Sequence, residues 1–187
     1  MPRTARLTRD DWAAAALDAL AEGGPGAVAV EPVAARLGAS KSSFYWLFEN
    51  RQALLEAALE RWERLQTEAV VAGLAEIPDP AERLRRLVHG AFAATGAGDL
   101  ALRLLTASDE PAVRAVVTRV TRRRLDVIEA AFAELGHPSD LARHYAMVSY
   151  SAFLGAAALR RVDISPEDTH AYVDAALAPF GIPPRAP

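Results

Sequence analysis

Helical periodicity runs along almost the whole chain and is the feature that most restricts its fold. Apolar residues recur at spacings of three and four in one segment after another. We find no run of alternating Val, Ile or Thr bounded by hairpin turns, which a β-sheet would require. Glycine and proline interrupt the helical pattern at "EGGPG", "IPDP" and "GHPSD", where helices are expected to end. The periodicity therefore predicts an all-α fold of about nine helices.

The amino-acid composition is typical of an ordinary soluble globular protein. Its 187 residues are enough to bury a core in one large or two small domains, and 51% of them are apolar. The chain has no cysteine, which excludes disulfides, a thiolate nucleophile and zinc–thiolate sites. No apolar run approaches the roughly 20 residues that span a bilayer, and the opening "MPRTARLTRDDW" lacks a hydrophobic signal region. We therefore expect a cytoplasmic location and no membrane partner.

Capping residues mark where the helices begin. Thr8 is placed as an N-cap, with Asp11 three positions later as in a capping box. Ser40 and Asn50 are placed to cap two further helices. The last helix is expected to begin at residue 165, with Pro166 in its first turn. In chain order, the expected helices cover residues 9–22, 31–37, 41–48, 51–74, 81–94, 99–107, 110–135, 139–161 and 165–180.

Residues 31–48 have the pattern of a helix-turn-helix. Their turn, "GAS", begins with a glycine, which supplies the positive φ of a tight turn. The apolar faces that can meet across it are Val33, Ala34 and Leu37 on one helix and Phe44, Leu47 and Phe48 on the other. Lys41, Ser42, Tyr45 and Trp46 then point outward. A second helix with a cation and short hydrogen-bond donors near its start suits the major groove of DNA.

The charge of the chain does not by itself favour nucleic acid. The formal net charge is −3, and residues 1–51 contain six basic and six acidic residues. Any DNA affinity must therefore come from the local placement of cations.

The stretch "VAARLGASKSSFYWLFENRQALL" resembles the N-terminal domain of TetR-family transcriptional regulators. The resemblance covers residues 8–55, including a first helix that ends in Gly-Gly. It implies a three-helix, helix-turn-helix DNA-binding domain over residues 1–51 and a helical ligand-binding and dimerisation domain over residues 52–187. It also implies a homodimeric repressor that a small-molecule effector releases from a palindromic DNA operator, and no cofactor.

The same resemblance implies the roles of individual residues in DNA binding. Lys41, Ser42 and Ser43 stand at the start of the recognition helix, where members of the family contact base edges and phosphates. Tyr45 matches a tyrosine that contacts a phosphate, and Trp46 matches a residue that packs against the sugar-phosphate backbone. The other implied contacts are Arg51, as a phosphate clamp opening the fourth helix, and Arg3, Arg6 and Arg9, as an N-terminal arm.

Two acidic residues depart from the family pattern. Glu31 stands where several members carry a basic residue that faces DNA, and Glu49 stands where Pro or Lys is common. Both would repel phosphates, so the operator sequence of a relative does not transfer to this chain. Two alternatives stay open: the outward residues form a surface for a partner protein, or the chain is a ligand-binding or adaptor protein whose helix-turn-helix no longer binds DNA.

The helix expected over residues 139–161 carries an apolar stripe with many small residues. The stripe is Leu141, Tyr145, Val148, Ala152, Gly155 or Ala156, and Leu159, and the final helix adds Tyr172, Ala175, Ala176 and Leu177. Small side chains allow helices to approach closely. The resemblance implies that the last two long helices pair across a two-fold axis; an ordinary core within one chain is the alternative.

The candidates for an effector pocket lie on the apolar stripes of the C-terminal helices. They are Trp62, Phe92, Leu105, Arg124, Phe132, His144 and Met147. Arg124 interrupts an apolar stripe, so it either extends to the helix edge or binds an anionic ligand. The four histidines lie on separate segments without metal-ligand spacing, and we expect no metal site. Neither a nucleophile with its base nor a pair of catalytic carboxylates is evident, so we do not expect an enzyme.

Overall fold

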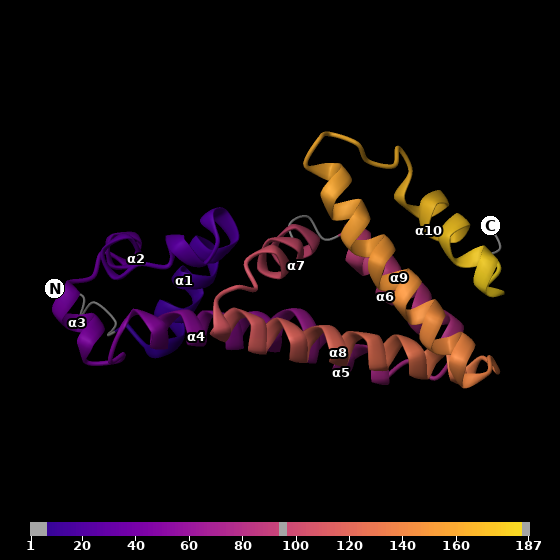
Figure 1. Ribbon diagram of the computed structural model, residues 1–187, viewed down its shortest axis with the longest axis horizontal. Coiled ribbons are helices and arrows are strands. Elements are labelled where there is room, and N and C mark those ends of the chain that lie inside the picture. The colour runs from indigo at the N-terminus through magenta and orange to yellow at the C-terminus, as the bar shows by residue number, and fades with distance from the viewer. Residues whose placement is uncertain (1–6, 94–96, 185–187) are drawn as a thin grey trace, which may run out of the picture. The chain divides into compact units, whose positions relative to one another are not determined.

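The computed structural model describes residues 7–93 and 97–184, in which every regular element is helical. The helices are α1 (Arg9–Gly23), α2 (Val30–Leu37), α3 (Lys41–Tyr45), α4 (Arg51–Glu63), α5 (Ala69–Ala75), α6 (Pro80–Ala93), α7 (Ala97–Thr106), α8 (Pro111–Glu134), α9 (Ser139–Arg160) and α10 (Thr169–Leu177) (Figure 1). A π-helical turn, Arg64–Glu68, joins α4 to α5, so these described residues form nine helical rods. The predicted all-α class is confirmed. None of the described helices has the length and apolarity needed to cross a membrane.

The chain forms two compact units. Among the described residues, unit 1 is drawn from Met1–Leu65 and Arg103–Val117, and unit 2 from Gln66–Leu102 and Thr118–Pro187. Helices α7 and α8 each contribute residues to both units. The predicted division after residue 51 remains a prediction.

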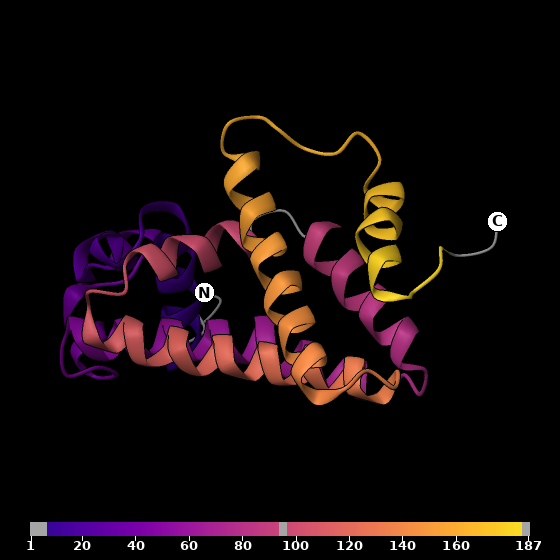
Figure 2. The same ribbon diagram turned by 45° about the vertical axis from the view of Figure 1, so that its right-hand side comes forward.

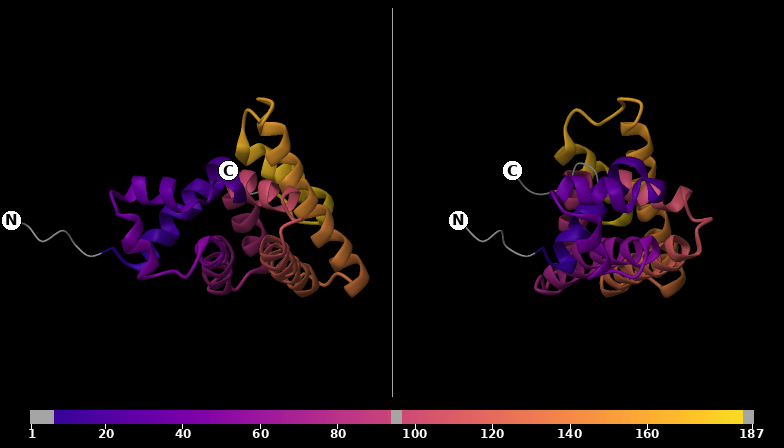
Figure 3. Two further views of the ribbon diagram at one scale, coloured as in Figure 1. Left: turned by 60° about the vertical axis from the view of Figure 1, so that its left-hand side comes forward. Right: turned by 90° about the vertical axis from the view of Figure 1, so that its left-hand side faces the viewer.

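The core of unit 1 forms where α1 packs against α4, which Figure 3 shows from two sides. Trp12 of α1 is fully buried, and its ring centroid lies 5.4 Å from that of Phe44 in α3. Leu54 and Leu55 of α4 are also fully buried. The contact between Trp12 and Phe44 attaches α3 to α1.

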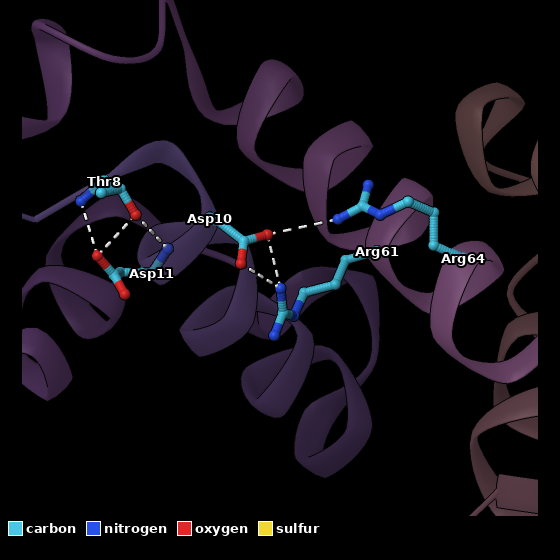
Figure 4. A network of polar contacts seen from close by, with 5 residues as sticks. All are labelled: Thr8, Asp10, Asp11, Arg61 and Arg64. Atoms are coloured by element: carbon cyan, nitrogen blue, oxygen red, sulfur yellow. Dashed lines mark hydrogen bonds and ion pairs between the residues drawn. The ribbon is translucent and has the colours of Figure 1, made fainter. Parts of the chain in front are cut away.

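Side-chain caps define the starts of α1, α3 and α4. The amide of Asp11 donates to Thr8 Oγ1 (3.2 Å) while the amide of Thr8 donates to Asp11 Oδ2 (2.7 Å), which completes the predicted capping box (Figure 4). Ser40 and Asn50 accept hydrogen bonds from the third residue of α3 and of α4. All three predicted caps are confirmed.

An ion pair connects the start of α1 to the end of α4. Figure 4 shows Asp10 facing Arg61, whose Nη1 lies 2.6 Å from the carboxylate, with Arg64 Nη2 at 3.4 Å. The carboxylate also lies in the first turn of α1, where the helix dipole favours negative charge.

Unit 2 has a separate core made by α6, α8, α9 and α10. Its buried side chains include Leu84 of α6, Phe132 of α8, Ala146 of α9, and Val173 and Leu177 of α10. Figure 2 shows α10 beside α6, with which it makes direct contact. The loop of residues 161–168 arches out between α9 and α10 in Figures 1 and 2.

Three helix-level predictions differ from the structure. The last helix begins at Thr169 rather than at residue 165, because Asp168 Oδ1 accepts from the amides of His170 and Ala171 and so caps it. Pro166 lies in the preceding loop. Helix α3 ends at Tyr45 instead of residue 48, since the chain then turns toward the next cap. The helix expected over residues 51–74 is interrupted by the π-helical turn, in which Leu65 is 50% exposed.

Candidate nucleic-acid interface

The turn between α2 and α3 has the geometry that a helix-turn-helix requires. Gly38 ends α2 with φ of +60°, in the left-handed region. Its amide donates to the carbonyls of Ala34 and Ala35. No atom lies within 4 Å of the position that a Cβ on Gly38 would occupy, so it is backbone conformation, not lack of space, that favours glycine here.

The short helix α3 has one buried side and one exposed side. Phe44 and Phe48 are 0% and 3% exposed and their rings stack with centroids 5.4 Å apart. Tyr45 and Trp46, by contrast, are 57% and 80% exposed. Lys41 and Ser42 are exposed as well. Four of the six predicted DNA contacts therefore lie on one open surface beside the turn, which we call the α3 surface: Lys41, Ser42, Tyr45 and Trp46.

The serines of this region are largely engaged with one another. Ser43 is half-buried; its amide donates to Ser40 Oγ (3.2 Å), and its hydroxyl donates to the Ser40 carbonyl (2.6 Å). The hydroxyl of Ser42 lies 2.9 Å from Ser40 Oγ. The structure therefore places Ser43 in the cap of α3 and leaves Ser42 on the exposed side.

Lys41 is paired with an acid on the preceding helix. Its Nζ lies 2.6 Å from Glu31 Oε1, and both side chains are more than half exposed, at 56% and 67%. The hydrogen bond and charge of Glu31 raise the pKa of Lys41, and the same contact lowers the pKa of Glu31. Both groups are therefore charged at neutral pH. The sequence indicated that Glu31 would repel phosphates, but it did not indicate that its carboxylate would bind the lysine.

Arg51 is turned toward the main chain between α1 and α2. Its Nε donates to the carbonyl of Val28 (2.7 Å) and its Nη2 to the carbonyl of Pro25. Its Nη1 lies 3.9 Å from Glu110. Here the guanidinium forms hydrogen bonds with the segment that connects α1 to α2. The predicted contact with a phosphate remains a prediction.

Arg9 also makes contacts within unit 1. Its Nη1 donates to the carbonyl of Leu47 (2.8 Å), and its guanidinium carbon lies 4.3 Å from the centroid of the Phe48 ring. Arg9 thus attaches the start of α1 to the segment after α3. The other two predicted arm residues, Arg3 and Arg6, lie outside the described residues.

The seven effector candidates belong to both compact units, and their role in ligand binding remains a prediction. In unit 1, Trp62 is 1% exposed and Leu105 is half-buried. In unit 2, Phe132 is fully buried, and Phe92 is half-buried with its ring centroid 5.0 Å from that of Tyr172.

The two candidates from α9 lie at the surface of the chain. His144 is exposed and Met147 is 53% exposed. Their helix also exposes Val148 and Leu159, at 54% and 49%. Most of the stripe predicted for dimerisation is thus uncovered in the single chain, although Tyr145 is half-buried.

Arg124 binds the π-helical turn between α4 and α5. Its Nε donates to Thr67 Oγ1 (3.1 Å) and its Nη2 to the carbonyl of Gln66 (3.0 Å). Thr67 is the buried polar residue of that turn, at 1% exposure. Inserting a residue into a helix displaces main-chain carbonyls from their usual partners, and the guanidinium provides such a partner here.

A small apolar hollow of about 160 Å³ lies within unit 2, between α5, α6 and α8. None of the seven effector candidates lines it. Its lining residues are Val71, Leu74, Ala75, Arg83, Leu84, Leu87, Val127, Ala130 and Ala131. Arg83 is the charged group of this lining and is bonded to Glu134.

A helix-turn-helix with an exposed recognition helix near the N-terminus, followed by an all-helical second unit, defines the class of helix-turn-helix transcriptional regulators. The sequence model of "Bacterial regulatory proteins, tetR family" matches residues 13–58, which contain α2, the Gly38 turn and α3. Within this match, residues 13–58 are similar to the DNA-binding region of TetR-family transcriptional regulators. Proteins of this family are regulators rather than enzymes. No curated protein matches the chain in sequence.

Solved structures share the fold over nearly their whole length. A TetR-family transcriptional regulator from a Rhodococcus species is 22% identical, with 92% of this chain and 97% of that chain covered and a TM-score of 0.69. A regulator from Saccharomonospora viridis, in complex with choline, is 22% identical (92% and 93% covered, TM-score 0.74). The regulator FadR from Bacillus subtilis, in complex with stearoyl-CoA, is 16% identical (91% and 96% covered, TM-score 0.67).

Proposed function

We propose that this regulator is a cytoplasmic repressor that binds a palindromic operator through the α3 surface and leaves it when a small molecule binds unit 2. The observation that carries the DNA contact is the exposure of Trp46 and Tyr45, at 80% and 57%, beside the lysine at the start of the same helix. Large aromatic side chains are seldom left in water without a partner, and a phosphate backbone suits the mixed polar and aromatic character of this surface.

Each residue of the α3 surface has a separate part in this proposal. Lys41 and Ser42 face base edges at the start of the recognition helix, and the Tyr45 hydroxyl donates to a phosphate. Trp46 packs on the sugar-phosphate wall. Ser43 acts through the cap of α3, since its hydroxyl and amide are bonded to Ser40.

We propose that two copies associate through the exposed face of α9. Leu141, Val148 and Leu159 are 37%, 54% and 49% exposed, with the small residues Ala152 and Gly155 exposed between them. Small residues at the centre of such a face let two helices approach closely. A two-fold pair would carry two copies of α3, which suits a palindromic site.

The effector is proposed to bind unit 2 next to its apolar hollow. Two regulators of the same fold are solved with bound small molecules, choline and stearoyl-CoA. In this chain the hollow of about 160 Å³ accommodates only a small apolar group. A ligand larger than this must open the packing of α5, α6 and α8, which would couple ligand binding to a change of conformation.

The test is DNA binding by fluorescence anisotropy, with duplexes that tile the region beside the chain's own gene, over a series of salt concentrations. We expect affinity for one duplex to fall steeply with salt, because bound cations displace counterions from the phosphates. Lys41→Ala and Tyr45→Phe should weaken binding. Arg86→Ala, which removes an exposed cation in unit 2, is the matched control and should leave it unchanged.

If Lys41→Ala and Tyr45→Phe bind every duplex as the wild type does, the α3 surface is not the DNA contact. If no duplex is bound by the wild-type protein at low salt, the outward residues serve a protein partner instead, which is the alternative that Glu31 and Glu49 favour.

A further inference from the structure

Two histidines far apart in the sequence meet at the edge of α6 and α10. His89 Nε2 and His170 Nε2 lie 3.2 Å apart although 81 positions separate the residues, and the ring centroids are 4.3 Å apart. His170 is exposed and His89 is half-buried, so solvent and solutes reach the pair. We propose that these two histidines bind a divalent transition-metal ion that prefers imidazole ligands, namely zinc, nickel or copper.

The spacing of the two nitrogens suits one shared ion. Zinc binds imidazole nitrogen at about 2.0–2.1 Å, and two such bonds at the tetrahedral angle place the nitrogens about 3.3–3.4 Å apart. The observed separation of 3.2 Å closes the angle at the ion by only a few degrees. The same separation also suits a hydrogen bond from one neutral imidazole to the other, which is the alternative that the experiment must exclude.

Packing beside the pair holds the two helices that carry the histidines. One turn beyond His89, the Phe92 ring lies 5.0 Å from that of Tyr172. On the other side, Val173 is 3% exposed and anchors α10 in the core of unit 2. A ligand pair held between packed helices loses little side-chain freedom when it binds a metal, which favours affinity.

The remaining coordination positions are open. In the described residues, no group of three or more His, Cys, Asp or Glu side chains is arranged to hold a metal ion. Asp168, next to the pair in sequence, has its Oδ1 engaged by the amides of His170 and Ala171. Arg85, one turn before His89, is directed to the carbonyl of Pro183 (2.7 Å) and to Glu82 (3.7 Å). Water would therefore complete the coordination shell.

A bound ion would join α6 to α10 by a second link beside their apolar contact. It would oppose separation of α10, which follows the long loop of residues 161–168. The proposal does not rest on the proposed DNA contact, because the α3 surface belongs to unit 1 and both histidines belong to unit 2.

The test is calorimetric titration of the metal-free, full-length chain, without a histidine tag, with zinc, nickel and copper chlorides. We expect one ion per chain, with copper bound most tightly. His89→Ala and His170→Ala should each weaken zinc binding at least tenfold and remove the rise in Tm that zinc produces. His144→Ala, which removes an exposed histidine of α9, is the matched control and should retain both.

Copper spectroscopy gives a second readout that does not depend on affinity. In electron paramagnetic resonance, Cu²⁺ should show two coupled imidazole nitrogens in the wild-type protein and one in either single variant, with folding of each variant checked by circular dichroism. The proposal is overturned if the wild-type protein binds no metal ion. It is also overturned if both alanine variants bind zinc as tightly as the wild type. The histidines would then be only a hydrogen-bonded pair.

Discussion

Arg51 provides the sharpest test of structure against family resemblance. The resemblance implies that Arg51 clamps a phosphate, whereas here its guanidinium donates to the carbonyls of Val28 and Pro25. A hydrogen bond to a charged group contributes about 1.5–3 kcal/mol to stability. Because the side chain is 41% exposed, water replaces part of both bonds in an alanine variant. We therefore expect Arg51→Ala to lower the free energy of unfolding by about 2 kcal/mol, which is less than the full value of the two bonds.

The assay is urea unfolding followed by tryptophan fluorescence, since Trp12 and Trp62 are buried in unit 1. With an m-value of about 2 kcal/mol/M, a loss of about 2 kcal/mol moves the midpoint down by roughly 1 M. Arg51→Lys keeps the charge but lacks the planar fork, so it should recover less than half of the loss. The reasoning is refuted if Arg51→Ala unfolds at the wild-type urea concentration while its affinity for DNA falls as far as that of Lys41→Ala.

Three further outcomes are expected. Glu31→Gln removes the carboxylate that pairs with Lys41 and leaves the lysine able to bind a phosphate. The slope of log affinity against log salt concentration should then steepen by about 0.9, which is an additional loss of about 3.5-fold in affinity between 50 and 200 mM salt. An unchanged slope would contradict this. Hydrogen bonds from Thr8 lower the pKa of Asp11 below its ordinary value of 3.8. The ionised Asp11 therefore stabilises the folded state above pH 3.8, and this contribution is lost as the pH falls through the lowered pKa. The urea concentration at the unfolding midpoint should decrease when the pH is lowered below about 4, and it should decrease less steeply in the Asp11→Asn variant. Leu159→Glu should convert the protein to monomers, which light scattering would detect. If the variant dimerises as tightly as the wild type, the exposed face of α9 is not the dimer interface.

Local signals in the sequence were enough to predict where most helices begin. Thr8, Ser40 and Asn50 each accept a hydrogen bond from an amide three positions later, so the residues that decide the start are adjacent in sequence. The turn at Gly38 was likewise predicted from a local signal, because glycine readily adopts the left-handed conformation that ends a helix. Burial of Phe44 and Phe48 followed from helical periodicity, since one face of that segment had to meet another helix.

Signals that depend on distant residues were missed. One local signal was also misjudged: Pro166 is a favourable first residue of a helix, but Asp168 accepts hydrogen bonds from two amides, and this stronger cap places the start of α10 at Thr169. The carbonyls that Arg51 binds belong to a turn 23 to 26 positions away. His89 and His170 are 81 positions apart, so no spacing rule links them. For Arg51 and for the two histidines, the partner is selected by tertiary packing, which the local pattern does not contain.

The pairing of Lys41 with Glu31 bears on the kind of DNA binding that the proposed function allows. Affinity for any phosphate backbone rises with the number of free cations that face it, and this term is the same for every sequence. In this chain the lysine of the α3 surface is 2.6 Å from a carboxylate, and Arg9 is bonded within unit 1. We therefore expect these two cations to add little non-specific attraction. Tight binding must come from contacts that form only when bases and phosphates are in register with α3. We therefore expect a large ratio of operator to non-operator affinity, together with a modest absolute affinity.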